Sequence, residues 1–145
     1  MTLLELIIAC AILLILSSAA LPIAKYTVIR QKEAELRRDL REMKDAIDRY
    51  KDAADRNQIR VEIGSEGYPP DLETLVKGVQ LGASSDRKIR FLRKVPVDPM
   101  TGQADWGLRA VQDDPDSTSW GGKNVFDVYS KSMGTALDGT KYSDW

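Results

Sequence analysis

"LRRDLREMKDAIDRYKDAA", residues 36–54, places apolar residues at alternating spacings of four and three. At these spacings the apolar side chains share one face of an α-helix, and charged side chains cover the rest of its surface. The apolar residues are Leu36, Leu40, Met43, Ile47, Tyr50 and Ala54. A coiled coil is the competing interpretation, but the stripe covers under three heptads. We therefore expect the chain's own C-terminal half to cover it.

The same helix is expected to extend back to the first residue. Residues 1–24 are apolar apart from Glu5 and a few hydroxyl side chains. A helix of that length reaches about 36 Å, and the hydrocarbon core of a bilayer is about 30 Å thick. Nothing breaks the helix before Arg56, so we expect one rod about 80 Å long. It divides into a membrane or filament-core part at 1–24 and an amphipathic part at 25–56.

A cleaved signal does not explain the first segment. It has no basic start, and its apolar run is longer than that of a secretory signal. The stretch Ile7-Ile8-Ala9-Cys10 resembles a lipobox, but the apolar run continues past Cys10. Two interpretations remain: a plain membrane anchor, or a segment that packs against copies of itself.

Glu5 and Pro22 bear on that choice. A carboxylate in hydrocarbon is normally paired, and the α-amine of Met1 is the only cation near Glu5 in the segment. If the amine comes from a neighbouring chain, Glu5 is an assembly device. Pro22 has no N–H and clashes with the carbonyl of Ser18, which predicts a kink or loosening there. A simple bend at the membrane exit explains Pro22 equally well.

Residues 57–145 predict a small α+β head. Asp71 and Gly78 bound a short helix, residues 80–88 form a loop, and the chain turns at 99–102. Residues 104–111 and 124–130 predict two antiparallel strands joined by a polar loop. The tail is rich in turn residues, and Trp145 is expected to pack. These elements predict the α+β fold class. A sheet this small is stable only when one face is covered, so we expect it to rest on the apolar stripe of the helix.

Charged pairs are expected on the helix surface away from this head. Glu33 and Arg37, and likewise Asp45 and Arg49, are four residues apart with the acid first. This order supports a helix. Both pairs are expected to face solvent.

The composition argues against catalysis and nucleic-acid binding. The chain has no His, one Cys and a formal net charge of −1. Ser–His and Cys–His pairs are thus impossible, and a basic surface for phosphates is lacking. We expect no enzyme, no catalytic residue and no nucleic-acid partner. The aspartates at 98, 105, 113, 114 and 116 fall at turns, where Asp is favoured for backbone reasons.

A calcium site near the C-terminus is a further hypothesis. Asp127, Asp138 and Asp144, with carbonyls from residues 130–140, offer the oxygen ligands that Ca²⁺ prefers. Their spacing does not match an EF-hand. A solvated loop is the alternative.

Taken together, these parts resemble a known superfamily. Residues 1–6, MTLLEL, followed by an apolar run and Pro22, resemble the mature N-terminus of type IV pilin-like proteins. Gly67-Tyr68-Pro69, "FLRKVPVDPMTG" (91–102) and the closing 125–145 resemble the major pseudopilin of type II secretion systems. The resemblance implies that a prepilin peptidase cuts and methylates the N-terminus, which makes Met1 the processed end. Family members usually begin with Phe, so Met1 is a departure.

The resemblance also implies an assembly. Glu5 would pair with the amine of an adjoining subunit, and the helix would loosen near Pro22. The chain would cross the bacterial inner membrane once, then join a periplasmic or extracellular helical filament that drives export. Further partners would be minor pseudopilins and an inner-membrane secretion platform. The family's calcium loop is usually longer and more acidic than this one.

Two alternatives stay open. One is the major subunit of a surface type IV pilus for adhesion or motility, although many such pilins carry a C-terminal disulfide. The other is a monomeric anchored domain that binds through "DDPDSTSWGG", residues 113–122.

Overall fold

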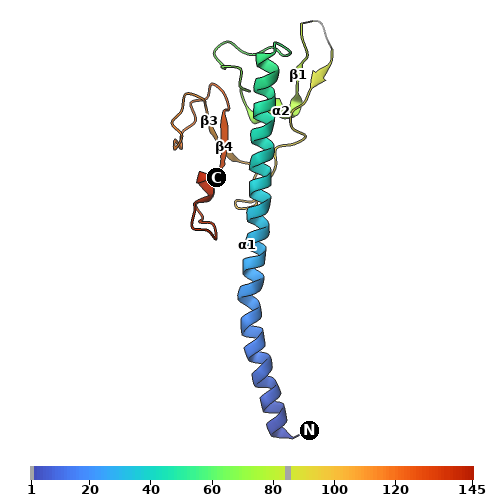
Figure 1. The fold of residues 1–145 in the computed structure, drawn as a ribbon, viewed down its shortest axis with the longest axis vertical. Coiled ribbons are helices and arrows are strands. Elements are labelled where there is room, and N and C mark those ends of the chain that lie inside the picture. Colours follow the sequence, from blue (N-terminus) through green and yellow to red (C-terminus); the bar gives the residue numbers. More distant parts are fainter. Residues whose placement is uncertain (1, 84–85) are drawn as a thin grey trace.

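The computed structural model describes residues 2–83 and 86–145. One long helix, α1 (Leu3–Asp55), runs the length of the molecule, and the head at 57–145 surrounds its C-terminal half (Figure 1). At 1.5 Å per residue, α1 is about 80 Å long. This confirms both the predicted single rod and the α+β fold class.

The end of α1 follows from local chemistry. Asn57 has a positive φ of 56°. Its N–H donates to the Ala54 carbonyl at 3.0 Å, and the Gln58 N–H donates to Ala53 at 2.9 Å. These two bonds form a Schellman motif, which satisfies the last carbonyls of the helix. The predicted stop at Arg56 and Asn57 is confirmed.

The predicted apolar stripe is the centre of the core. All six of its side chains are buried, from Leu36 at 0% exposed to Ala54 at 9%. The head covers them with its own buried residues, which include Leu75, Phe91, Leu92, Trp106, Val125 and Val128. The expectation that the chain's own C-terminal half covers the stripe is therefore confirmed.

The head contains one short helix and a pair of longer strands. Helix α2 (Leu72–Lys77) begins where the Asp71 carboxylate accepts from the Thr74 N–H at 2.7 Å. Strands β3 (Trp106–Arg109) and β4 (Asp127–Ser130) are antiparallel, and they pair Trp106 with Ser130. The predicted short helix and the predicted antiparallel strand pair are both confirmed.

Within this pair, Gly107 lies under the ring of Tyr129. A Cβ at Gly107 would lie 2.2 Å from the ring, so only glycine fits without a shift. The guanidinium of Arg109 also lies against this ring, 4.0 Å from its centroid. One aromatic side chain thus covers the gap that the glycine leaves in the sheet.

The sequence analysis did not predict a second, smaller pair of strands. Strands β1 (Val79–Gln80) and β2 (Lys88–Ile89) pair antiparallel at the two ends of the stretch 80–88 that was expected to be a loop. Gly78 precedes them at φ 83°, and a Cβ there would meet the Ile89 carbonyl at 2.7 Å. Strands of two residues are too short to show an alternating pattern, which explains the miss. Figure 1 shows this pair and the β3–β4 pair on opposite sides of α1.

Candidate assembly surface and head–helix junction

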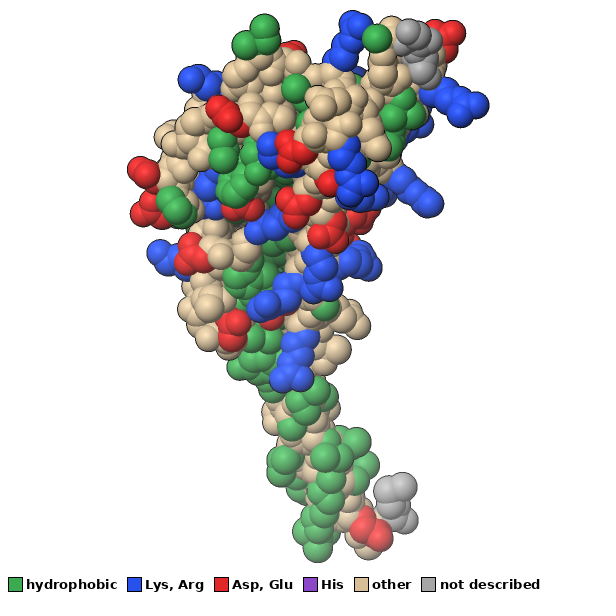
Figure 2. All heavy atoms as spheres, turned by 45° about the horizontal axis from the view of Figure 1, so that its top comes forward, with side chains coloured by type: hydrophobic (Ala, Val, Ile, Leu, Met, Phe, Trp, Pro, Cys, Tyr) green, Lys and Arg blue, Asp and Glu red, His purple; other side chains and the backbone are tan. Residues whose placement is uncertain are grey.

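The N-terminal half of α1 presents an uncovered apolar surface. Residues 3–28, here called the apolar half, project beyond the head as a mostly apolar stalk (Figure 2). Their large side chains are all exposed: Leu3, Leu4, Leu6, Ile7, Ile8, Ile12, Leu13, Leu14, Ile15, Leu16, Leu21, Ile23, Tyr26 and Val28. Soluble monomers rarely expose so much contiguous apolar surface. Within the part of the chain that the structure describes, α1 is the one helix long and apolar enough to cross a membrane.

Glu5 belongs to the start of α1. Its Oε2 accepts from the Thr2 N–H at 3.1 Å and from the Thr2 hydroxyl at 3.3 Å. The Thr2 Oγ1 in turn accepts from the Glu5 N–H at 3.2 Å. This is a capping box, which satisfies backbone donors that a helix start leaves free. The Thr-x-x-Glu spacing predicts it, and the sequence interpretation overlooked it.

The α-amine of Met1, predicted to pair with Glu5, is not part of the structure described. Met1, the expected processed end, lies outside the described residues. Pairing between Glu5 and an amine therefore stays a prediction. An ionised carboxylate accepts up to about four hydrogen bonds, so the capping box leaves room for a further donor.

Pro22 lies inside α1, and the chain is α-helical on both sides of it. Because Pro22 lacks an N–H, the Ser18 carbonyl loses its usual donor. The Ser18 hydroxyl donates to the Ile15 carbonyl at 2.7 Å, one turn earlier. Loosening at Pro22 during assembly stays a prediction.

The C-terminal residues contact α1 at Glu33 and Arg37, next to the apolar half. Residues 134–145, here called the tail, contain the one-turn helix η1 (Tyr142–Asp144). The Oε1 of Glu33 accepts from the Leu137 N–H at 2.9 Å and from the Tyr142 hydroxyl at 3.0 Å. Burial, and then this carboxylate, raise the pKa of Tyr142.

Two cations of α1 also reach the tail. The Arg37 guanidinium lies 3.4 Å from the Asp138 carboxylate and 3.8 Å from the centroid of the Trp145 ring. Lys44 donates to the Trp145 carbonyl at 3.4 Å. The expectation that Trp145 packs is confirmed, because the residue lies against the core.

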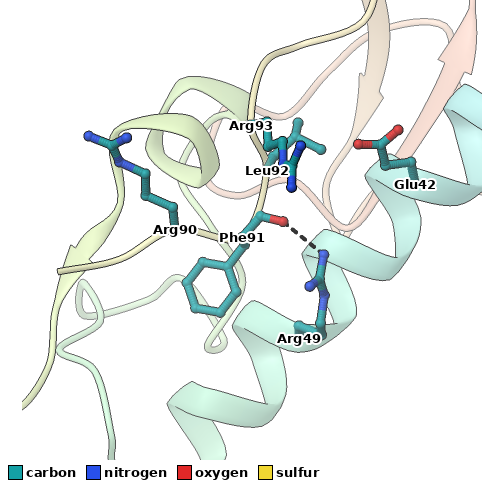
Figure 3. Close-up of a pocket in the computed structure, with 6 residues that line it drawn as sticks. All are labelled: Glu42, Arg49, Arg90, Phe91, Leu92 and Arg93. Carbon is teal, nitrogen blue, oxygen red and sulfur yellow. Dashed lines mark hydrogen bonds between the residues drawn. The ribbon is translucent and has the colours of Figure 1, made fainter.

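Of the charged residues predicted to face solvent, Arg37, Asp45 and Arg49 are exposed, whereas Glu33 is half-buried. The sequence did not show that three of them also contact the head. Glu33 and Arg37 face the tail, as described above. Arg49 donates to the Phe91 carbonyl at 2.8 Å and so reaches into the head (Figure 3). The spacing of four residues correctly indicated a helix. It gave no information about which of these residues contact the head.

The hollow beside Arg49 shows little that catalysis needs. It measures about 370 Å³, and its lining consists of Glu42, Arg49, Arg90, Phe91, Leu92 and Arg93 (Figure 3). This lining offers neither a nucleophile nor a general base poised beside one. That the chain is no enzyme stays an expectation.

Asp98 has a structural partner that the sequence did not reveal. Its side chain is fully buried and accepts from the Met100 N–H at 2.8 Å, as expected for a turn. Its other oxygen accepts from the buried Ser130 hydroxyl at 2.5 Å. Asp98 therefore ties the turn at 99–102 to β4.

The three candidate calcium ligands do not form a site. Asp127 lies 3.1 Å from Lys44 and 3.4 Å from Arg109, and Asp138 pairs with Arg37. Across residues 2–83 and 86–145, no group of three or more His, Cys, Asp or Glu side chains is placed to hold a metal. Calcium needs about six to eight oxygen ligands, and two of the three candidates, Asp127 and Asp138, already face cations. The residues do not fit the ion.

Searches of protein-family models, of curated proteins and of solved structures found no match to this chain. The functional interpretation therefore depends on the apolar half of α1, its glutamate and its proline.

Proposed function

We propose that this chain is a filament subunit, a major pseudopilin that polymerises into the helical pseudopilus of a type II secretion system. The pseudopilus would drive protein export across the outer membrane. One observation carries the proposal: the helix that forms the core of the head continues as an uncovered apolar half. The resemblance of MTLLEL, Pro22 and the C-terminal motifs to pseudopilins adds the type of filament.

The exposed apolar half needs cover in every state of the protein. Before assembly, the inner membrane provides it, and the chain crosses the bilayer once. In the periplasm, the same surface would face water unless copies of the segment packed against it. Head-to-tail packing of identical chains generates an open helix when the rotation does not close into a ring. Prepilin peptidase, the secretion platform and minor pseudopilins are the partners in this proposal.

In the proposed filament Glu5 has two tasks. It caps its own helix through Thr2, and its charge pairs with the α-amine of Met1 from a neighbouring chain. Such a pair fixes the register of the subunits and adds little net stability, because both charges must be desolvated.

The two tasks can be separated by substitution. Glu5→Gln retains a capping box, since Gln serves at this position, but removes the charge. Thr2→Ala removes the cap and retains the charge. We expect Glu5→Gln to insert into the membrane and fail to form filaments, and Thr2→Ala to assemble. Electron microscopy of sheared filaments and membrane fractionation measure the two outcomes.

Normal filaments from Glu5→Gln would contradict the pairing. Failure of Thr2→Ala alone would show that capping is the only role of Glu5. If the unchanged chain forms only monomers in the presence of its assembly machinery, the filament itself is wrong and an anchored monomer takes its place.

A further inference from the structure

We propose that the tail is fastened to α1 by the chain's own cations and hydrogen bonds, without a divalent metal ion. Arg37 and Lys44 neutralise the carboxylates that a metal would otherwise hold. These contacts lie within the head and its part of α1, so they do not depend on filament formation.

The first contact lies between β4 and α1. Asp127 is 27% exposed and has Lys44 at 3.1 Å on one oxygen and Arg109 at 3.4 Å on the other. Both of its oxygens thus face a cation. A metal at Asp127 would have to displace these charges or be repelled by them.

The second contact lies at the tip of the tail. Asp138 accepts from the Thr140 N–H at 2.9 Å and from the Thr140 hydroxyl at 2.6 Å. The Thr140 hydroxyl first, and then its N–H, lower the pKa of Asp138. Arg37 adds its charge at 3.4 Å. The loop at 138–140 is therefore stabilised by hydrogen bonds that Thr140 donates to Asp138.

The third contact joins the two at Trp145, whose carbonyl accepts from Lys44 at 3.4 Å. Arg37 also lies on the face of the Trp145 indole, whose Nε1 donates to the Thr140 hydroxyl oxygen at 2.7 Å. Glu33, one turn before Arg37, accepts from the Leu137 N–H and the Tyr142 hydroxyl. One acid and two cations of α1 thus contact four parts of the tail: the Leu137 amide, the loop at 138–140, the Tyr142 hydroxyl and the last residue.

The test uses the full chain in detergent micelles. Hydrogen exchange of peptides from residues 134–145, and the midpoint of thermal unfolding, are measured in EDTA and in excess calcium chloride. We expect both quantities to be the same in the two conditions. Slower exchange of the tail, or a higher midpoint in calcium, would overturn the proposal.

Substitutions test the fastening itself. Arg37→Met keeps the length of the side chain and removes its charge. The Arg37–Asp138 pair is half-exposed, but Arg37 also lies on the Trp145 ring, so tail exchange should rise roughly fivefold in EDTA, with no rescue by calcium. Arg56, which forms an exposed pair with Asp52 at the C-terminal end of α1, supplies the control Arg56→Met. Unchanged tail exchange in Arg37→Met, or rescue by calcium, would contradict the assignment.

Discussion

Acidic side chains along α1 differ in the partners that stabilise them. Glu5 and Glu33 each accept from two donors, at the helix start and at the tail. Asp39 is different, because it is only 6% exposed and its ion-pair partner, Arg38 at 3.6 Å, is itself 71% exposed. Burial raises the pKa of Asp39, and Arg38 offsets only part of that effect. Asp39 therefore destabilises the folded head when it is ionised.

Asp39→Asn should stabilise the head at neutral pH. A raised pKa means that the folded chain holds this proton more tightly than the unfolded chain does. The favourable contribution is present below the unfolded pKa of about 3.9 and is lost as pH rises through the folded pKa. The gain from Asp39→Asn should thus be largest at pH 7 and vanish below the unfolded pKa, at about pH 3. Urea unfolding at the two pH values measures it. The exposed Asp48→Asn is the control, and a loss of stability at pH 7 would contradict the argument.

At the scale of elements, α1 has two halves with different requirements. Met43 is fully buried under the head, whereas Leu13 is 62% exposed in the apolar half. Met43→Ala should lower the free energy of unfolding of the head by about 2–5 kcal/mol. Leu13→Ala should leave that value unchanged, within about 0.5 kcal/mol, and reduce filament yield.

Urea unfolding in micelles, followed by near-ultraviolet circular dichroism, separates the two variants. Equal losses of head stability would show that the halves are energetically coupled. An unchanged yield of filaments from Leu13→Ala would count against tight packing at that position.

The sequence predicted those elements whose signal is local. The stripe of α1, the caps of α2 at Asp71 and Gly78, and the β-rich residues of β3 and β4 each lie within one short window. The two-residue strands β1 and β2 lacked such a signal.

Contacts between distant residues were not predictable in this way. Arg37 and Asp138 are 101 positions apart, and a single sequence does not show that they meet. The same holds for Asp98 and Ser130, which are 32 positions apart. Glu5 and Pro22, the residues proposed to act in assembly, were singled out because each is unusual in an apolar helix, yet the capping role of Glu5 was missed.

At the scale of the whole molecule, Pro22 is the one residue within α1 that cannot donate a backbone hydrogen bond. Pro22→Ala restores the donor to the Ser18 carbonyl and removes a ring that costs a helix interior about 3 kcal/mol. We expect slower hydrogen exchange at residues 17–26 and filaments with altered packing. The melting midpoint of the head should not move.

A cryo-electron microscopy map of Pro22→Ala filaments measures the packing. The unchanged chain, prepared in parallel, is the reference. A map identical to that reference would remove Pro22 from the assembly argument.

The continuity of α1 also has a mechanical consequence. A single helix runs from Leu3 to Asp55 and forms both the stalk and the central support of the head. Tension applied to the part of α1 between Pro22 and the head therefore reaches the head core through continuous helix. The tail contacts at Glu33, Arg37 and Lys44 lie where the load enters the head. Under force, these contacts should be among the first in the head to bear load, before the buried stripe of α1 does.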